Sequence, residues 1–313
     1  MKIAVLDAKT LGDDIDLGIL GEDLSVFSTT EPEEVCQRIV NAEVLVVNKI
    51  KLNGTNLPVA KKLKLICVAA TGYDNIDLEY CREHNIAVCN VKGYSTHSVA
   101  QLTVMMVLSL VMHQREYCDF VTSGEYTKSG VANRLSPVYH ELFGKTWGIV
   151  GLGNIGKQVA KVAGAFGCRV IAFKRTPCDE FECVGLSELM EKSDIISVHL
   201  PATEQTRGII SRDMIGKMKK DAVLVTVARG AVTDEQALCD AILEDKIGGL
   251  GVDVYSKEPF DEKHPFNKIM GMNNVILTPH IAWGAYESRV RCMEEIKENI
   301  KSFSLGEKRN RLV

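Results

Sequence analysis

Residues 147–176 read WGIVGLGNIGKQVAKVAGAFGCRVIAFKRT, and this stretch decides the fold. It opens with an apolar run at 147–150, typical of a buried strand. Three closely spaced glycines follow, then an apolar-periodic segment to Phe166 and a second strand-like run at 168–173. Strand, glycine turn, helix and strand within about thirty residues form the context in which a Gly-x-Gly-x-x-Gly motif binds a dinucleotide.

Each glycine of the motif has a separate predicted role. Gly151 permits a tight turn, Gly153 lets backbone N–H groups approach a pyrophosphate, and Gly156 lets the helix pack on the strand. The helix that begins near Asn154 and Ile155 then offers N–H donors and a partial positive charge to an anion. The alternative is an ordinary glycine-rich turn, which the flanking strand and helix patterns disfavour.

The tip of the second strand indicates which dinucleotide is bound. An NAD-binding chain usually has an acidic residue there, which accepts from the ribose 2′-hydroxyl. This chain has Lys174, Arg175 and Thr176 instead. Two cations and a hydroxyl favour the 2′-phosphate of NADP(H), while NAD(H) stays possible. The alternative is a solvated pair of charges at a strand end.

The gross numbers bound the class of protein. A chain of 313 residues suits two domains, and 46% hydrophobic with 25% charged residues is ordinary globular composition. A net charge of −4 gives no basic field, so we expect neither a nucleic-acid nor a membrane partner. The ten cysteines form no C-x-x-C pair. Reduced thiols and a cytoplasmic location are therefore expected.

The chain before the motif predicts a small parallel α/β sheet. Strand-like runs alternate there with helical patches, at 2–7, 42–48, 64–70 and 86–91 for the strands and at 32–40, 57–63 and 78–84 for the helices. One long apolar helix is expected from residue 95 to about 121, followed by an irregular polar stretch at 122–142.

The chain after the motif resumes the alternation. Strands are expected at 195–199, 222–227, 249–255 and 274–278, with helices at 186–191, 213–218, 234–243 and 286–303. The last helix can return the chain to the first sheet. We therefore predict an α/β fold of two Rossmann-like parallel-sheet domains. Residues 1–94 plus 285–313 form the substrate domain, into which a dinucleotide-binding domain at 95–284 is inserted.

Three strand ends carry side chains suited to carbonyl chemistry. Arg229 follows the strand at 222–227, Glu258 follows the strand at 249–255, and His280 follows the last strand. Carboxyl ends of parallel strands are where open α/β sheets bind ligands. Each residue alone is more often structural, but the three together beside a dinucleotide motif indicate catalysis.

The sequence resembles the D-isomer-specific 2-hydroxyacid dehydrogenases over nearly its whole length. The resemblance rests on the glycine motif and on STHSVAQ, LPATEQTRGII, VARG, DVYSKEP and TPHIAW, with AATGYDNID near the start. HIAW and GYDNID are most similar to the glyoxylate/hydroxypyruvate reductase (glycerate dehydrogenase) branch. The resemblance implies hydride transfer between NAD(P)H and a small 2-keto acid to give a D-2-hydroxy acid.

The resemblance also implies roles for particular residues. The family's catalytic Arg, Glu and His correspond to Arg229, Glu258 and His280. Its substrate-carboxylate loop corresponds to Thr71, Gly72 and Tyr73, with Arg229 and His280 completing the substrate site. Cofactor contacts beyond the glycines, Lys174, Arg175 and Thr176 are implied for Asn154, Ile155, Pro201, Thr206, Val227, Arg229, Asp253 and His280. No metal is implied.

These assignments predict a mechanism. The Arg229 guanidinium holds the substrate carboxylate and polarises the keto oxygen. His280, as an imidazolium, donates a proton to that oxygen, and the Glu258 carboxylate stabilises His280 in its charged form. Backbone N–H groups of residues 70–73 bind the substrate carboxylate from the other domain, and domain closure excludes water.

Other readings stay open. A family member acting on D-lactate, 2-ketoisocaproate or phosphite is one, because Lys49, Tyr73 and Trp283 set the pocket size. Lys49 either meets the substrate or covers a strand end, and the latter is favoured. A dinucleotide-sensing binding protein of the same fold is another. We further expect a homodimer formed through the helix at 95–121 and the stretch at 122–142.

Overall fold

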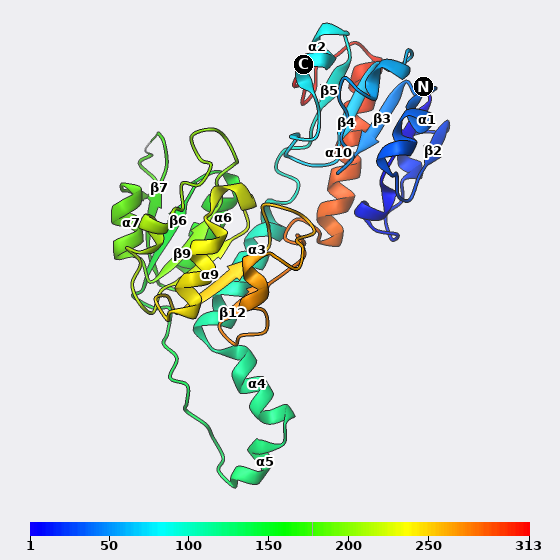
Figure 1. Ribbon diagram of the computed structural model, residues 1–313. Helices are drawn as coiled ribbons and strands as arrows, with labels where there is room; N and C mark the ends of the chain where they lie inside the picture. The colour runs from blue at the N-terminus through cyan, green and yellow to red at the C-terminus, as the bar shows by residue number, and fades with distance from the viewer. Residues whose placement is uncertain (177) are drawn as a thin grey trace. The chain divides into compact units, whose positions relative to one another are not determined.

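The computed structural model describes residues 1–176 and 178–313. The chain divides into two compact units, Met1–Ser95 with Gly284–Val313, and Thr96–Trp283. Each unit is built on a parallel sheet that helices cover (Figure 1). The predicted fold class, α/β with two parallel-sheet units, is confirmed.

The first unit, Met1–Ser95 with Gly284–Val313, contains a five-stranded sheet in the order β2-β1-β3-β4-β5. Its strands are β1 Ile3–Val5, β2 Leu24–Val26, β3 Val44–Val47, β4 Leu65–Val68 and β5 Ala87–Cys89. All neighbouring pairs are parallel. Strand β2 was not predicted. It is a three-residue edge strand without a fully buried residue, so it leaves no apolar run in the sequence.

Helices cover both faces of this sheet. Helices α1 (Val35–Ile39) and α2 (Leu78–Glu83) bury apolar side chains against one face. Helix α10 (Tyr286–Ser304) packs on β4, which brings the end of the chain back to the first unit. The helix expected at 57–63 is only the 3-10 turn Leu57–Val59, because the backbone leaves the helical region at Ala60, where ψ is 64°.

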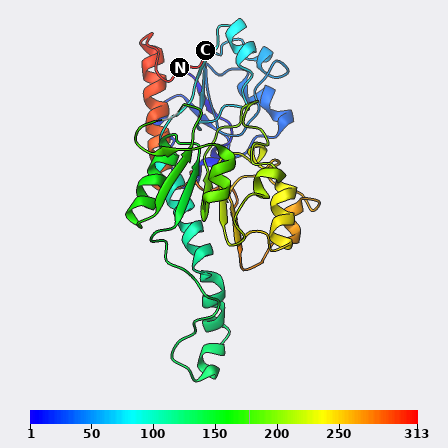
Figure 2. The same ribbon diagram turned by 90° about the vertical axis from the view of Figure 1, so that its left-hand side faces the viewer.

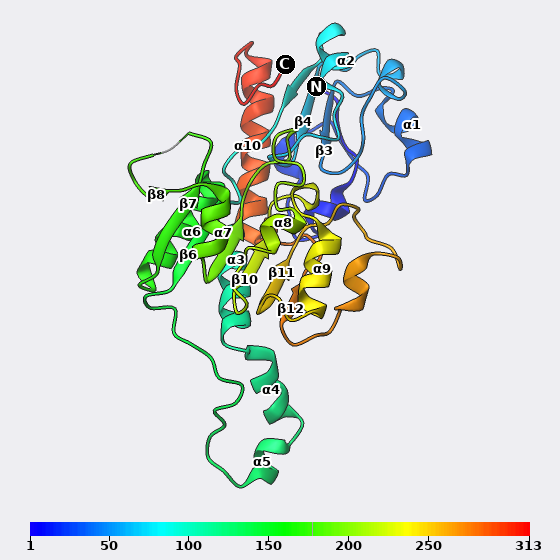
Figure 3. The ribbon, with the colours of Figure 1, turned by 60° about the vertical axis from the view of Figure 1, so that its left-hand side comes forward.

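The second unit has a seven-stranded parallel sheet in the order β12-β11-β10-β9-β6-β7-β8 (Figure 3). The strands are β6 Thr146–Val150, β7 Arg169–Phe173, β8 Glu182–Cys183, β9 Ile195–Val198, β10 Val223–Thr226, β11 Gly249–Val252 and β12 Val275–Leu277. The order reverses between β6 and β9. Doubly wound sheets bind ligands at this switch point, beyond the carboxyl ends of the strands. The two-residue strand β8 was not predicted.

Two apolar clusters sandwich this sheet. Helices α3 (Thr96–Val111) and α6 (Asn154–Ala165) pack with Trp147 and Ile149 on one face. On the other face lie α7 (Leu186–Lys192), α8 (Arg212–Ile215) and α9 (Glu235–Leu243). Both faces of β6 are therefore buried, which holds the glycine turn that follows it in a fixed position.

The helix expected to run from residue 95 to about 121 is broken. Helix α3 ends at Val111, and His113 adopts a left-handed conformation with φ 49° before α4 (Gln114–Thr122) begins. The two helices meet at a 65° bend. Helix α5 (Glu125–Ser129) follows, and this arm projects away from the sheet of the second unit (Figure 2).

Among the described residues, no single helix is both long and apolar enough to cross a bilayer. Within residues 1–176 and 178–313, one bent pair, α3 and α4 taken together, reaches that length and composition.

Candidate active site at the carboxyl edge of the second sheet

The glycine turn joins β6 to α6. Gly151 has φ +99°, a conformation that side chains with a Cβ rarely adopt. A Cβ at Gly156 would lie 2.2 Å from the carbonyl oxygen of Gly151, so only glycine lets the helix approach the turn so closely. A Cβ at Gly153 would meet nothing within 4 Å, so open space adjoins the backbone there. The turn fits a ligand that approaches the backbone at Gly153.

The first turn of α6 faces the same space. Asn154 is exposed and Ile155 is half-buried, and the first turn contains no acidic residue. An α6 of 12 residues is long enough to present a partial positive charge at its N-terminus. The turn and the helix therefore fit the pyrophosphate of a dinucleotide.

Lys174, Arg175 and Thr176 follow β7 at the same edge of the sheet. Lys174 is half-buried, while Arg175 and Thr176 are exposed. Glu180 lies close enough for the positive charge of Lys174 to contribute to lowering its pKa. The larger cause of that lowered pKa is the hydrogen bond from Lys157. Lys174 and Arg175 therefore lie together at the end of β7, and Glu180 is an acid close to Lys174.

The three predicted catalytic residues follow β10, β11 and β12. His280 Nδ1 lies 2.6 Å from Glu258 Oε2, and Glu258 Oε1 accepts the backbone N–H of Tyr255 at 2.9 Å. The Arg229 guanidinium donates to the carbonyl of Ala228 at 2.8 Å. A carboxylate that holds Nδ1 fixes the imidazole ring and directs Nε2 toward a substrate. The structure therefore joins His280 and Glu258 as a pair.

The strand end of β10 also packs tightly on the segment that leads to Glu258. A Cβ at Gly230 would lie 2.0 Å from the carbonyl carbon of Tyr255, so the chain after Arg229 rests directly on the backbone of residues 255–256. Arg229 and Glu258 are consequently carried on two segments in direct backbone contact. This contact depends on glycine at position 230.

Asp253 has a function that the sequence alone did not reveal. Its fully buried carboxylate accepts the Thr278 hydroxyl at 2.5 Å and the backbone N–H groups of Ile281 and Ala282, each at 2.8 Å. Desolvation raises the pKa of Asp253, and these three hydrogen bonds oppose that rise. All of these contacts fix residues 278–282, the loop that carries His280.

The backbone of His280 is itself strained. Its φ of 55° lies in the left-handed region, which costs a residue with a Cβ about 1–2 kcal/mol. The hydrogen bond that the Ile281 N–H donates to Asp253, and the contact of the His280 ring with Glu258, hold it there. Such strain is typical of positions where the direction of a side chain matters.

Glu235 is a residue of this site that the sequence analysis did not name. From the start of α9 it accepts the backbone N–H of Ser256 at 2.7 Å and its hydroxyl at 2.5 Å. It also lies 3.1 Å from His264 Nε2, and both side chains are nearly buried. Glu235 thereby fastens the segment leading to Glu258. The only signal in the sequence was an acidic residue at a helix start.

His199 is a further histidine on this edge, after β9. Its Nε2 lies 3.0 Å from the Ser197 hydroxyl, and its Nδ1 has no hydrogen-bond partner among the described residues. Desolvation lowers the pKa of His199 to about 3, so it is neutral at physiological pH. Of His199 and His280, only His280 has a carboxylate that stabilises an imidazolium.

The remaining predicted cofactor residues also follow strands of this sheet. Thr206 donates to the carbonyl of Pro201 at 2.5 Å and closes the loop after β9. Val227 is buried at the end of β10. These residues, the glycine turn and the His280–Glu258 pair all lie at the carboxyl edge of one sheet.

The predicted substrate loop belongs to the first unit. Thr71, Gly72 and Tyr73 follow β4, and the Thr71 hydroxyl donates to the carbonyl of Val91 at 2.8 Å. Lys49 lies after β3, where its backbone N–H donates to the buried Asp7 carboxylate at 2.5 Å. These residues belong to the first unit, whereas Arg229, Glu258 and His280 belong to the second.

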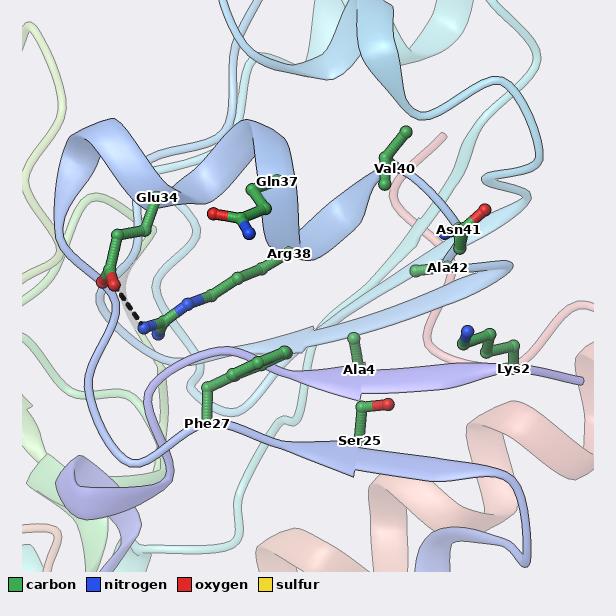
Figure 4. A pocket seen from close by; sticks show the side chains of 10 residues that line it. All are labelled: Lys2, Ala4, Ser25, Phe27, Glu34, Gln37, Arg38, Val40, Asn41 and Ala42. Atoms are coloured by element: carbon green, nitrogen blue, oxygen red, sulfur yellow. Dashed lines mark ion pairs between the residues drawn. The ribbon is translucent and has the colours of Figure 1, made fainter.

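The first unit also contains a hollow of about 410 Å³ that is unrelated to these residues. Figure 4 shows it beside Phe27 and Arg38, between β1, β2 and α1. Arg38 pairs with Glu34 at 2.7 Å, so its charge is already compensated. In the described part of the chain, no three His, Cys, Asp or Glu side chains are grouped so as to hold a metal ion.

The sheet order and glycine turn define a dinucleotide-binding α/β unit, and the His280–Glu258 pair gives it the polar groups of an oxidoreductase. Comparison with known proteins agrees. Residues 104–282 match the sequence profile described as "D-isomer specific 2-hydroxyacid dehydrogenase, NAD binding domain". The chain belongs to the D-isomer specific 2-hydroxyacid dehydrogenase family, as the sequence motifs predicted.

Relatives and solved structures are similar over most of the chain. A hydroxypyruvate reductase of Blautia hydrogenotrophica is 34% identical and covers 98% of each chain. A glyoxylate reductase of Thermococcus litoralis is 38% identical over 86% of this chain and 82% of its own.

Two solved structures share the fold at 30% identity. One is an acyclic imino acid reductase in complex with NADPH and D-Arg, with TM-score 0.86 and full coverage of both chains. The other is a D-lactate dehydrogenase of Aquifex aeolicus complexed with NAD and lactic acid. Its TM-score is 0.82, and the match covers 97% of this chain and 96% of that one.

Proposed function

We propose that this dehydrogenase reduces glyoxylate to glycolate or hydroxypyruvate to D-glycerate, and that it uses NADPH in preference to NADH. The observation that carries the reaction type is the 2.6 Å contact between His280 and Glu258 at the carboxyl edge of a dinucleotide-binding sheet. The names of the similar reductases support the choice of substrate. Lys174 and Arg175 at the end of β7 support the choice of cofactor.

Each residue of the site has a defined task in this proposal. Arg229 holds the substrate carboxylate with two parallel hydrogen bonds and polarises the adjacent keto oxygen. His280 donates the Nε2 proton to that oxygen, while Glu258 holds Nδ1 and stabilises the imidazolium before transfer. The dinucleotide, when bound, supplies the hydride.

The proposed substrate is tested with a panel of 2-keto acids. Glyoxylate, hydroxypyruvate, pyruvate and 2-ketoisocaproate are each assayed with NADPH and NADH, and the product is analysed on a chiral column. We expect the highest kcat/KM for glyoxylate or hydroxypyruvate, and the D-enantiomer wherever the product is chiral. A preference for pyruvate would instead identify a D-lactate type enzyme, the alternative that the Aquifex structure favours.

The same assay addresses a second alternative, a dinucleotide-sensing binding protein. Such a protein binds the cofactor but has no need of a paired acid. The His280–Glu258 contact argues for turnover. Tight NADPH binding with no reduction of any acid in the panel would support the sensor.

The Glu258 carboxylate positions the His280 ring in this mechanism. In Glu258→Gln an amide replaces the carboxylate that holds Nδ1, so the charge-assisted hydrogen bond that fixes the ring is lost. We expect kcat for reduction to fall while the dissociation constant of the cofactor stays unchanged, and steady-state kinetics with a cofactor titration measures both. A wild-type kcat would contradict the pairing as a functional feature, and Glu262→Gln serves as a control at an exposed acid nearby.

We also propose a homodimer formed through the arm of the second unit. Leu135 and Phe143 are 75% and 77% exposed, and Val121, Val131 and Val138 are exposed as well. So much apolar surface on a projecting segment is typical of an interface.

The ten free cysteines are further consistent with a reducing, cytoplasmic location, which we include in the proposal.

The arm is tested by light scattering at micromolar concentration. The wild-type chain should have twice its monomer mass, and Leu135→Glu with Val138→Glu should give a folded monomer, because buried charges destabilise an apolar interface. Leu305→Glu, at a 66% exposed position in the first unit, is the control and should leave the dimer intact. A monomeric wild-type chain would overturn the proposal.

A further inference from the structure

Two cysteines lie side by side next to the proposed 2′-phosphate site. Cys178 and Cys183 have their sulfur atoms 4.0 Å apart, and both residues are half-buried. Cys183 is on β8, where it is in register with Ala172 of β7. Lys174 and Arg175 follow directly from β7. Cys178 therefore lies in the same connection between β7 and β8 as the two cations, and Cys183 lies on β8 at the end of that connection.

The surroundings of Cys178 favour its thiolate. Partial desolvation raises the pKa of this thiol. The backbone N–H groups of Phe181 and Glu180, the Cys183 thiol and the charge of Lys174 lower it, and the net pKa is below the ordinary value. Burial instead raises the pKa of six other cysteines, namely Cys67, Cys81, Cys89, Cys168, Cys239 and Cys292. Cys178 thus combines accessibility, thiolate character and a neighbouring sulfur, which together define a reactive cysteine.

We propose that Cys178 and Cys183 are a redox-active dithiol that hydrogen peroxide converts to an intramolecular disulfide. The Cys178 thiolate attacks one peroxide oxygen, the O–O bond breaks, and hydroxide leaves and becomes water, so that Cys178 is a sulfenic acid. The sulfur of Cys183 then attacks the Cys178 sulfur. The S–O bond breaks, and the second hydroxide leaves as water with the Cys183 proton. Two thiols lose two electrons to one peroxide, and a dithiol reductant reverses the step.

The dithiol is coupled to the cofactor, and this part rests on the proposed function. The Lys174 charge that favours the Cys178 thiolate is the charge assigned to the 2′-phosphate of NADPH. Two anions that share one cation disfavour each other. Bound NADPH therefore lowers the thiolate fraction of Cys178 and slows its oxidation. NADH has no 2′-phosphate and leaves the Lys174 charge available to the thiolate.

The proposal is tested by peroxide titration of the reduced, full-length protein. Samples without cofactor, with saturating NADPH and with saturating NADH are quenched by alkylation, and each thiol is quantified by mass spectrometry. We expect a Cys178–Cys183 disulfide before oxidation of Cys36, a half-buried cysteine of the first unit, at a rate several-fold slower with NADPH than with NADH. Dithiothreitol should restore both thiols.

Two variants identify the order of attack. In Cys183→Ser the sulfenic acid on Cys178 should persist and be trapped by dimedone, whereas in Cys178→Ser the reactivity of Cys183 should fall to that of Cys36. Oxidation of Cys178 no faster than Cys36, or the absence of the disulfide, would overturn the proposal. Disulfide formation with equal protection by NADPH and NADH would leave the dithiol standing and contradict only the assignment of Lys174 to a 2′-phosphate.

Discussion

Replacing His280 with alanine should lower kcat for keto-acid reduction by about 10²–10⁴-fold, because general acid catalysis contributes a factor of that size. The side chain is half-buried, and its Nδ1 is held by Glu258, so Nε2 is the position from which a proton reaches the keto oxygen. Steady-state kinetics between pH 5 and 9, with saturating cofactor, measures the effect.

Two further measurements show that such a loss reports chemistry. The dissociation constant of the cofactor, measured by fluorescence, should change little, since the glycine turn is intact in His280→Ala. His84→Ala is the matched control. His84 is exposed and stacks on Tyr80 in the first unit, with ring centroids 3.9 Å apart. A His280→Ala enzyme with the wild-type kcat over this pH range would remove His280 from the mechanism.

The double change Lys174→Asp with Arg175→Ala should reverse the cofactor preference from NADPH to NADH. A charge-assisted hydrogen bond contributes about 1.5–3 kcal/mol before screening by solvent, which corresponds to roughly a tenfold to hundredfold preference. An aspartate at the end of β7 would instead accept from a ribose 2′-hydroxyl and repel a phosphate. The ratio of kcat/KM for the two cofactors measures the reversal.

The KM for the keto acid should hardly change in this variant, because neither residue belongs to the His280–Glu258 group. Lys246→Asp is a suitable control. Lys246 pairs with Glu244 between α9 and the start of β11, at the opposite edge of the sheet. A wild-type enzyme that prefers NADH would show that Lys174 and Arg175 interact with solvent, while the reaction type would stand.

The order of strands and helices was largely predictable because parallel sheets buried on both faces have continuous apolar strands. The buried runs of β3, β4, β9 and β10 are plain in the sequence. Strand β8 has only two residues, and neither is fully buried, so no pattern marks it. The end of α3 was missed for a different reason. The polar residues at 113–116 are equally common on the surface of a continuous helix, so nothing in the sequence marks the left-handed backbone of His113.

The candidate site was predictable where a residue type alone indicates chemistry. Arg229, Glu258 and His280 could be proposed because strand ends of one parallel sheet meet at one edge. The support around them could not be predicted. Asp253 bonds residues 278–282, and Glu235 bonds Ser256, across more than twenty positions of sequence in each case. Such contacts depend on loop conformations that neither periodicity nor spacing determines.

The discontinuity of the first unit has a consequence for synthesis on the ribosome. Its β4 is covered by α10, where Cys292 lies near Cys67, and β5 is joined by the N–H of Leu312, which donates to Val88 at 2.8 Å. After Ser95 the ribosome must still add the 218 residues 96–313. Their synthesis takes about 10–40 s at typical elongation rates. During that interval an apolar face of the nascent sheet lacks its covering helix, whereas the second unit is already contiguous. The first unit to emerge is therefore the last to be completed, and chaperones that bind exposed apolar strands should be found on translating ribosomes at this stage.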